Sequence, residues 1–114
     1  MTTVQRADLK VGDSLPAHNA GPISRTVLAL FAGGSGGHNP MHVDIDFAKQ
    51  FGFPDVFAHG MLSMAYLAQL VTGWVPQERI RSYGVRFASI TPVHAHVVCT
   101  GEIGRLYEEN GEAR

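Results

Sequence analysis

Two histidine-containing stretches hold the residues of this sequence that are best suited to acid–base chemistry. The first, FAGGSGGHNPMH, runs from Phe31 to His42 and places an Asn39-Pro40 pair just before its last histidine. Proline fixes its own backbone φ and disfavours the helical region for the residue before it, so the pair holds His42 in a defined position. An imidazole exchanges protons near neutral pH, and His42 is therefore a candidate acid–base group.

The second stretch is AHGML, from Ala58 to Leu62, at the start of a long apolar segment. The first amides of a helix lack intrahelical partners and lie at the positive end of the helix dipole. The N–H of Gly60 could therefore polarise a carbonyl group or hold an oxyanion, and a glycine lets the ligand come close. For the side chain of His59, we expect a capping or core position.

Other kinds of site are less well supported by the residue spacing. The proline between His38 and His42 excludes the helical ligand pair of an HExxH motif, and His94 and His96 share a face of a predicted strand without a third ligand. There is no GxSxG motif, Cys99 lies in an apolar strand, and GGSGG is not followed by GK[ST]. We expect no metal and no cofactor.

Composition limits the classes of function. The chain has 114 residues, 45% of them hydrophobic and 17% charged, and a net charge of −1, which is typical of a globular protein without affinity for nucleic acid or anionic membranes. It has one cysteine, no signal-peptide pattern at its start and no apolar run of transmembrane length. These features predict a cytoplasmic protein.

Helices are predicted over residues 27–31, 47–51 and 60–73. Ser24 or Thr26 can cap the first and Asp44 or Asp46 the second, because their side-chain oxygens accept hydrogen bonds from first-turn amides. The third is apolar almost all round, which predicts a buried helix that other elements must cover.

The cover is expected from strands that follow the third helix. Arg81 to Ala88 and Val93 to Ile103 alternate and are rich in β-branched and aromatic residues, which predicts two strands. Tyr107 to Glu112 is typical of a charged hairpin turn. A sheet curled around a central helix is the implied architecture.

The two histidine stretches, read together, resemble a known family. SGGHNPMHVDIDFAKQFGF followed by FAHGMLSMAYLAQLV is similar to the MaoC-like hydratases and dehydratases, whose signature is SGDxNPxHxD, a short helix and then AHGM. The resemblance runs from about Val11 to Ile103. It implies an α+β chain with the hot-dog fold, a curved antiparallel sheet wrapped around a long central helix. Residues 1–114 are expected to form a single such domain without its last one or two strands.

The resemblance also assigns roles to residues. It implies that His42 is the catalytic histidine and that the Gly60 amide donates to the thioester carbonyl, while Gly37 stands where the family signature has aspartate. Candidates to replace that carboxylate are His38, Asp44 and Asp46, the two aspartates being better explained as helix caps. The residues expected to contact substrate are Gly37, His38, Asn39, His59 and Met61.

The family acts on (R)-3-hydroxyacyl and trans-2-enoyl thioesters, so the resemblance implies a hydratase or dehydratase on acyl-CoA or acyl-carrier-protein thioesters. Because the signature aspartate is missing, hydrolysis or another nucleophile addition on the same thioester is an alternative. A non-catalytic thioester-binding or supporting subunit is a third. A homodimer, or a heterodimer with a related subunit, is expected.

Overall fold

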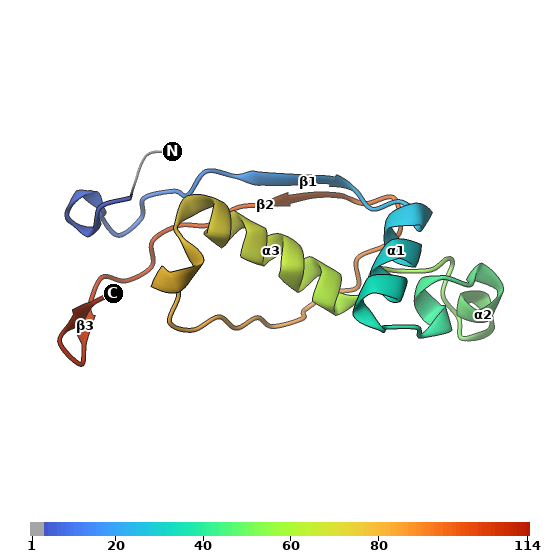
Figure 1. The fold of residues 1–114 in the computed structure, drawn as a ribbon. Coiled ribbons are helices and arrows are strands. Elements are labelled where there is room, and N and C mark those ends of the chain that lie inside the picture. The colour runs from blue at the N-terminus through green and yellow to red at the C-terminus, as the bar shows by residue number, and fades with distance from the viewer. Residues whose placement is uncertain (1–3) are drawn as a thin grey trace.

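The structure is a computed structural model that describes residues 4–114, with helices and short antiparallel strands in one α+β chain (Figure 1). The first three residues of the sequence lie outside the described residues. The elements in chain order are η1 (Arg6–Asp8), β1 (His18–Pro22), α1 (Arg25–Ser35), η2 (Pro40–His42), α2 (Ile45–Gln50), α3 (Gly60–Trp74), η3 (Gln77–Arg79), β2 (His96–Cys99), β3 (Glu108–Glu109) and β4 (Glu112–Ala113), where η marks a 3-10 helix.

The strands β1 and β2 form a two-stranded antiparallel sheet that lies along α3 (Figure 1). Their register pairs His18 with Cys99 and Pro22 with His96, with an irregularity between Asn19 and Gly21. Near the C-terminus, β3 and β4 pair as the hairpin that the sequence predicts. The hairpin lies at one end of the molecule, α1 and α2 gather at the other, and the sheet lies between them beside α3 (Figure 1).

The helix α1 begins where the sequence predicts and ends later. Ser24 is its N-cap, because the Ser24 hydroxyl accepts from the Val27 amide at 3.0 Å. The helix continues through Gly33 and Gly34 to Ser35 and closes at Gly36, whose φ of 78° is the left-handed conformation that glycine adopts most easily. The glycine-rich loop is therefore shorter than the glycine run.

The helix α3 matches the predicted span, but it is covered on one side instead of all round. Its buried side chains are Leu62 and Leu70, whereas Met61 is 58% exposed. The sheet of β1 and β2 covers part of the helix surface, which leaves other apolar residues in contact with solvent. No helix within residues 4–114 combines the length and the apolar character needed to cross a membrane.

The strand predicted over Arg81–Ala88 is wrong for the described structure. A strand requires a ladder of backbone hydrogen bonds, and none is formed over these residues. The predicted strand Val93–Ile103 is reduced to β2, because His94 adopts a left-handed φ of 72° in a turn. His94 and His96 therefore do not share a strand face, which removes the basis of that possible ligand pair.

The hydrophobic core lies among α1, α2 and the start of α3. Ile23 and Leu28 are fully buried, and Phe31 and Met41 pack at the edge of the same cluster. The buried members of the cluster are Ile23, Leu28, Ala48, Val56, Ala58, Leu62 and Val93. They come from every segment that leads into the two histidine stretches, so one apolar cluster fixes the relative positions of those stretches.

An ion pair joins the same segments at the surface. The Arg25 guanidinium donates to both carboxylate oxygens of Asp55, at 2.9 and 2.6 Å. Hydrogen bonding from Arg25 lowers the pKa of Asp55 from 3.8 to about 2, so the carboxylate stays charged near neutral pH. The pair connects the start of α1 to the segment that precedes α3.

Asp44 caps α2, and its replacement by alanine should lower the free energy of unfolding. The Asp44 carboxylate accepts from the amides of Asp46 and Phe47 at 3.0 and 3.2 Å. Loss of such a cap costs about 0.5–2 kcal/mol, to be measured by urea unfolding. Asp46→Ala is the matched control, because the Asp46 side chain does not cap the helix. An equal loss in both variants would contradict the capping role.

Candidate functional site

His42 is the last residue of η2, and local hydrogen bonds fix its backbone. The Asn39 side chain accepts from the Met41 amide at 3.0 Å, with Pro40 as the first residue of the short helix. The His42 Nδ1 lies 2.8 Å from the carbonyl oxygen of Phe57. Because a carbonyl only accepts, Nδ1 carries the proton and the other ring nitrogen, Nε2, holds the lone pair. This is the tautomer that a general base requires.

The surroundings of His42 favour its neutral form. Burial lowers the pKa of His42 below its ordinary value of 6.5, and the neighbouring His59 lowers it as well. The hydrogen bond to the Phe57 carbonyl acts in the opposite direction, but burial is the largest effect. Near neutral pH, Nε2 is therefore available to accept a proton.

His59 lies against His42, at the N-cap of α3. The two imidazole rings are stacked with their centroids 3.9 Å apart and an angle of 28° between their planes. The His59 Nε2 lies 2.8 Å from the Gly37 carbonyl oxygen, and its Nδ1 is buried without a hydrogen-bond partner among the described residues. The side chain is 6% exposed. His59 is therefore buried, as the sequence predicts, but it does not cap the helix with its side chain.

Gly37, where the family signature has aspartate, has the ring of His59 beside it. A Cβ atom placed on Gly37 would lie 3.1 Å from His59 Cδ2 and 3.2 Å from the Ser35 hydroxyl. The Ser35 hydroxyl donates to the Phe31 carbonyl at 2.6 Å and accepts from the Gly37 amide at 3.2 Å. The space next to this backbone is thus already occupied by side chains.

Gly60 is the first residue of α3, and its amide is free for a ligand. Neither the Gly60 nor the Met61 amide has a hydrogen-bond acceptor within residues 4–114. The Phe87 ring lies over Gly60, 3.2 Å from the position that a Cβ would take. A side chain at this position would therefore contact the Phe87 ring closely.

Two cavities meet at this pair of residues. The larger, about 590 Å³, is lined by His42, His59, Gly60 and Met61 together with residues of α1. The smaller, about 230 Å³, is lined by His42 and Gly60 together with Phe57 and Phe87. The possible proton acceptor and the possible oxyanion donor therefore lie on both cavities.

The other residues predicted for the site lie near His42 and Gly60 but do not line the two cavities. His38 and Asn39 are exposed and line neither cavity, and Asn39 acts through its hydrogen bond to the Met41 amide. Asp44 is occupied as the α2 cap. Within residues 4–114, no three His, Cys, Asp or Glu side chains gather closely enough to hold a metal ion.

Three contacts of the site do not appear in the sequence reasoning. They are the carbonyl of Phe57 behind His42, the hydroxyl of Ser35 beside Gly37, and the edge of the Phe31 ring against His59, with centroids 4.8 Å apart. A backbone carbonyl carries no sequence signal, since every residue has one. The position of Ser35, two residues before Gly37, is the one contact that local sequence could have indicated.

The sequence is similar to proteins of known activity. The family described as the MaoC like domain matches residues 7–110. The 3-hydroxyacyl-thioester dehydratase X of Mycobacterium tuberculosis is 43% identical over 66 residues, which cover 58% of this chain and 23% of the relative. The (R)-specific enoyl-CoA hydratase of Rhodospirillum rubrum is 39% identical over 69 residues, which cover 60% of this chain and 46% of that protein. The chain thus spans less than half the length of either curated relative.

The fold is similar to a solved structure as well. The unliganded R-hydratase PhaJ1 from Pseudomonas aeruginosa superposes with a TM-score of 0.80 and 26% sequence identity. The match covers 95% of this chain and 70% of that protein. This likeness confirms the predicted hot-dog, α+β fold, whereas the extent of the domain within residues 1–114 stays a prediction.

Titration of His42 should give a pKa below 6.5, because burial disfavours the imidazolium form. As pH falls, His42 should therefore accept its proton later than an ordinary histidine. The ring C–H signals in a proton NMR titration measure this, and a His42→Gln variant assigns them by their disappearance. A midpoint at or above 6.5 would show that the ring is more exposed, or more strongly paired, than the structure has it.

Proposed function

The chain belongs to the family of MaoC-like domains, and on that basis we propose that it interconverts trans-2-enoyl and (R)-3-hydroxyacyl thioesters. The observation that carries this proposal is the position of the His42 Nε2 lone pair and the free Gly60 amide on the same cavities. Hydration of a conjugated thioester needs a base for the water molecule and a donor for the carbonyl oxygen. The described residues offer one of each.

The carbonyl oxygen of the thioester is the group that we assign to α3. As water adds to C3 of the enoyl group, negative charge develops on this oxygen, and an amide at the positive end of a helix stabilises it. The Gly60 amide is free to donate and lies next to the apolar ring of Phe87. A bound acyl chain that displaced water from this amide would strengthen the hydrogen bond.

His42 is the group that we assign to proton transfer. Its Nε2 accepts a proton from water as the oxygen bonds to C3, and the protonated ring then gives a proton to C2. Addition of H and OH across the double bond leaves His42 neutral, so the atoms and charges balance over the cycle. The reverse sequence removes water from the 3-hydroxyacyl thioester.

We assign each cavity to one part of the substrate, on either side of the reacting atoms. A thioester held between His42 and Gly60 extends its acyl chain into one cavity and its carrier arm into the other. The larger cavity is lined by Phe31, Met61 and Ala65 among others, which suits an apolar acyl chain. The names of the two curated relatives include a 3-hydroxyacyl thioester and an enoyl-CoA, which supports a CoA or carrier-protein thioester as the substrate class.

Hydrolysis of the same thioester is the second candidate function. No carboxylate lines either cavity in the described part of the chain. Attack of water on the thioester carbonyl uses one base and one oxyanion donor, without proton delivery to carbon. The observed pair of His42 and Gly60 is sufficient for that reaction too.

We also propose that the chain pairs with a second copy or with a related subunit. Large apolar side chains are more than half exposed near the site and along the sheet, and exposed apolar surface of this kind is typical of interaction sites. They are Leu30, Met61, Phe87, Ile90 and Val98. Light scattering after size exclusion should give a molar mass near twice that of one chain, whereas a single-chain mass for the purified protein would exclude a homodimer.

Loss of the His42 side chain should abolish turnover of an enoyl thioester. We expect His42→Ala to lower the hydration rate of crotonyl-CoA by about 10²–10⁴-fold, because a general base contributes about that much. The loss of ultraviolet absorbance of the conjugated thioester measures the reaction. His96→Ala is the matched control, since His96 is exposed on β2 and lines neither cavity.

The same samples distinguish the alternatives. Release of free thiol that depends on His42, with no loss of the double bond, would replace hydration by hydrolysis as the function. Binding of the thioester with neither reaction, in the chain alone, would favour a supporting subunit. Equal activity of His42→Ala and the wild type would remove His42 from the chemistry altogether.

A further inference from the structure

We infer that His59 is a positioning residue for His42. The inference rests on the proposed acid–base role of His42 in the preceding section. It assigns a task to a histidine that the family resemblance leaves without one.

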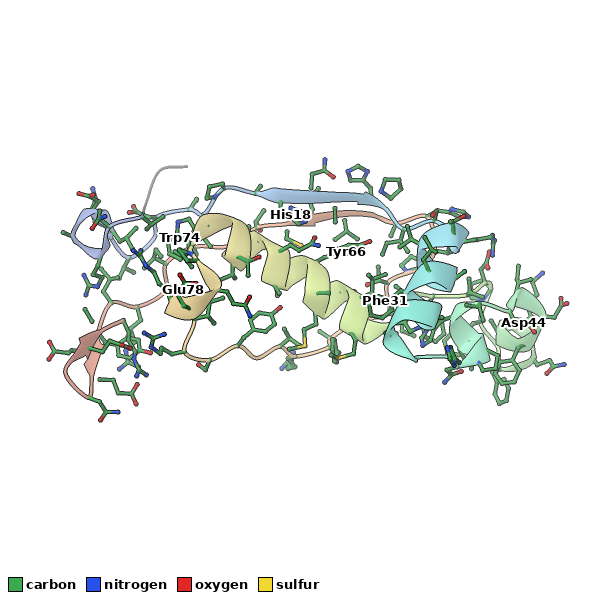
Figure 2. All side chains as sticks on the ribbon, in the orientation of Figure 1. His18, Phe31, Asp44, Tyr66, Trp74 and Glu78 are labelled. Atoms are coloured by element: carbon green, nitrogen blue, oxygen red, sulfur yellow. The ribbon has the colours of Figure 1, made fainter. Side chains whose placement is uncertain are left out.

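His59 connects two segments that are far apart in sequence. Its Nε2–H donates to the Gly37 carbonyl at 2.8 Å, which ties the loop after α1 to the start of α3. Figure 2 shows Phe31, on α1, where this helix comes close to the start of α3, and the Phe31 ring packs against His59 edge-on. The loop that leads to His42 is therefore held by a side chain from the helix that carries Gly60.

The ring of His59 also limits the motion of His42. The stacked rings are in van der Waals contact, with centroids 3.9 Å apart. Phe57 makes two further contacts with His42. Its carbonyl accepts the hydrogen bond from Nδ1, and its ring packs edge-on against the imidazole, with the ring centroids 5.2 Å apart. With Nδ1 and one face fixed, the Nε2 lone pair points in one direction, as acid–base catalysis requires.

Gly37 and His59 are in close contact. A Cβ on Gly37 would lie 3.1 Å from Cδ2 and 3.4 Å from Nε2 of His59, and 3.2 Å from the Ser35 hydroxyl. A side chain at this position would therefore require its neighbours to shift slightly, and the family signature, which has aspartate here and a histidine in AHGM, accommodates one.

The buried Nδ1 of His59 is a second, independent observation. Nε2 donates to the Gly37 carbonyl, so Nδ1 holds a lone pair that finds no donor in residues 4–114. Buried polar atoms without a partner are rare, and each calls for a specific explanation. The buried imidazole, with its Nε2 bonded to the Gly37 carbonyl, is a rigid neighbour for His42, with the ring centroids 3.9 Å apart.

The other ionisable groups near His42 do not contact its ring in this way. Among the described residues, none other than His59 stacks on the His42 ring or bonds to it. The groups on the surrounding segments are exposed or already engaged in caps and ion pairs: His38, Asp44, Asp46, Lys49, Asp55 and Arg86. His59 is thus the side chain whose replacement should change the titration of His42.

Two substitutions separate the ring from the hydrogen bond. His59→Phe keeps an aromatic ring but removes the donor to the Gly37 carbonyl, and His59→Gln keeps a donor in a similar position but removes the ring. Burial is the main cause of the lowered pKa of His42 and stays in His59→Phe, so we expect this variant to raise that pKa only in part in an NMR titration, through loss of the neighbouring imidazole. We expect the hydration rate to fall by about 10–100-fold in His59→Phe and by less in His59→Gln.

The matched controls are His96→Phe and His96→Gln, which should leave the His42 titration unchanged. An unchanged His42 titration in both folded His59 variants would overturn the inference, whatever their activity. Should either variant fail to fold, the ¹⁵N shifts of the wild-type His59 ring decide instead, since a proton on Nδ1 would contradict the donor role of Nε2. Absence of hydration in the wild type would refute the proposed function and leave the titration test in force.

Discussion

Two imidazole groups donate hydrogen bonds to backbone carbonyls at the place where the loop before α2 meets the start of α3, and the geometry of the site depends on both. His42 donates through Nδ1 to the Phe57 carbonyl, and His59 donates through Nε2 to the Gly37 carbonyl. Each bond fixes a tautomer, because a carbonyl oxygen cannot donate. The bonds run in opposite directions between the two segments, one from the loop toward the residues before α3 and one from the start of α3 back to the loop.

These two bonds are effective because the backbone around them is held independently. The apolar cluster that includes Ile23, Leu28 and Val56 packs beneath both segments, and the Arg25–Asp55 ion pair joins them at the surface. An exposed ion pair adds little stability by itself, so the buried cluster supplies most of the support. The side chains of the site can therefore keep their positions although much of α3 is exposed.

Local features of this protein were predictable from its sequence, and pairings between distant segments were less so. The cap at Ser24, the cap at Asp44 and the span of α3 follow from residue types within a few positions. The prediction for Arg81–Ala88 failed because β propensity describes a segment, whereas a strand also needs a partner for its backbone. The family signature identified His42, Gly37 and Gly60, but it could not reveal that a histidine 22 residues from Gly37 lies against that glycine.

The stacked pair also limits how a reaction could proceed at this site. An imidazolium on His42 would be poorly solvated in its partly buried position and would lie 3.9 Å from a second imidazole whose one proton is already committed. A long-lived charge on His42 is therefore costly, and burial is the main reason why the pKa of His42 is lowered. In the proposed hydration, the protonated ring should therefore be short-lived and give its proton to C2 soon after the oxygen bonds to C3. With one base and no carboxylate on either cavity among the described residues, transfer through a single face of the substrate is the route that this geometry favours.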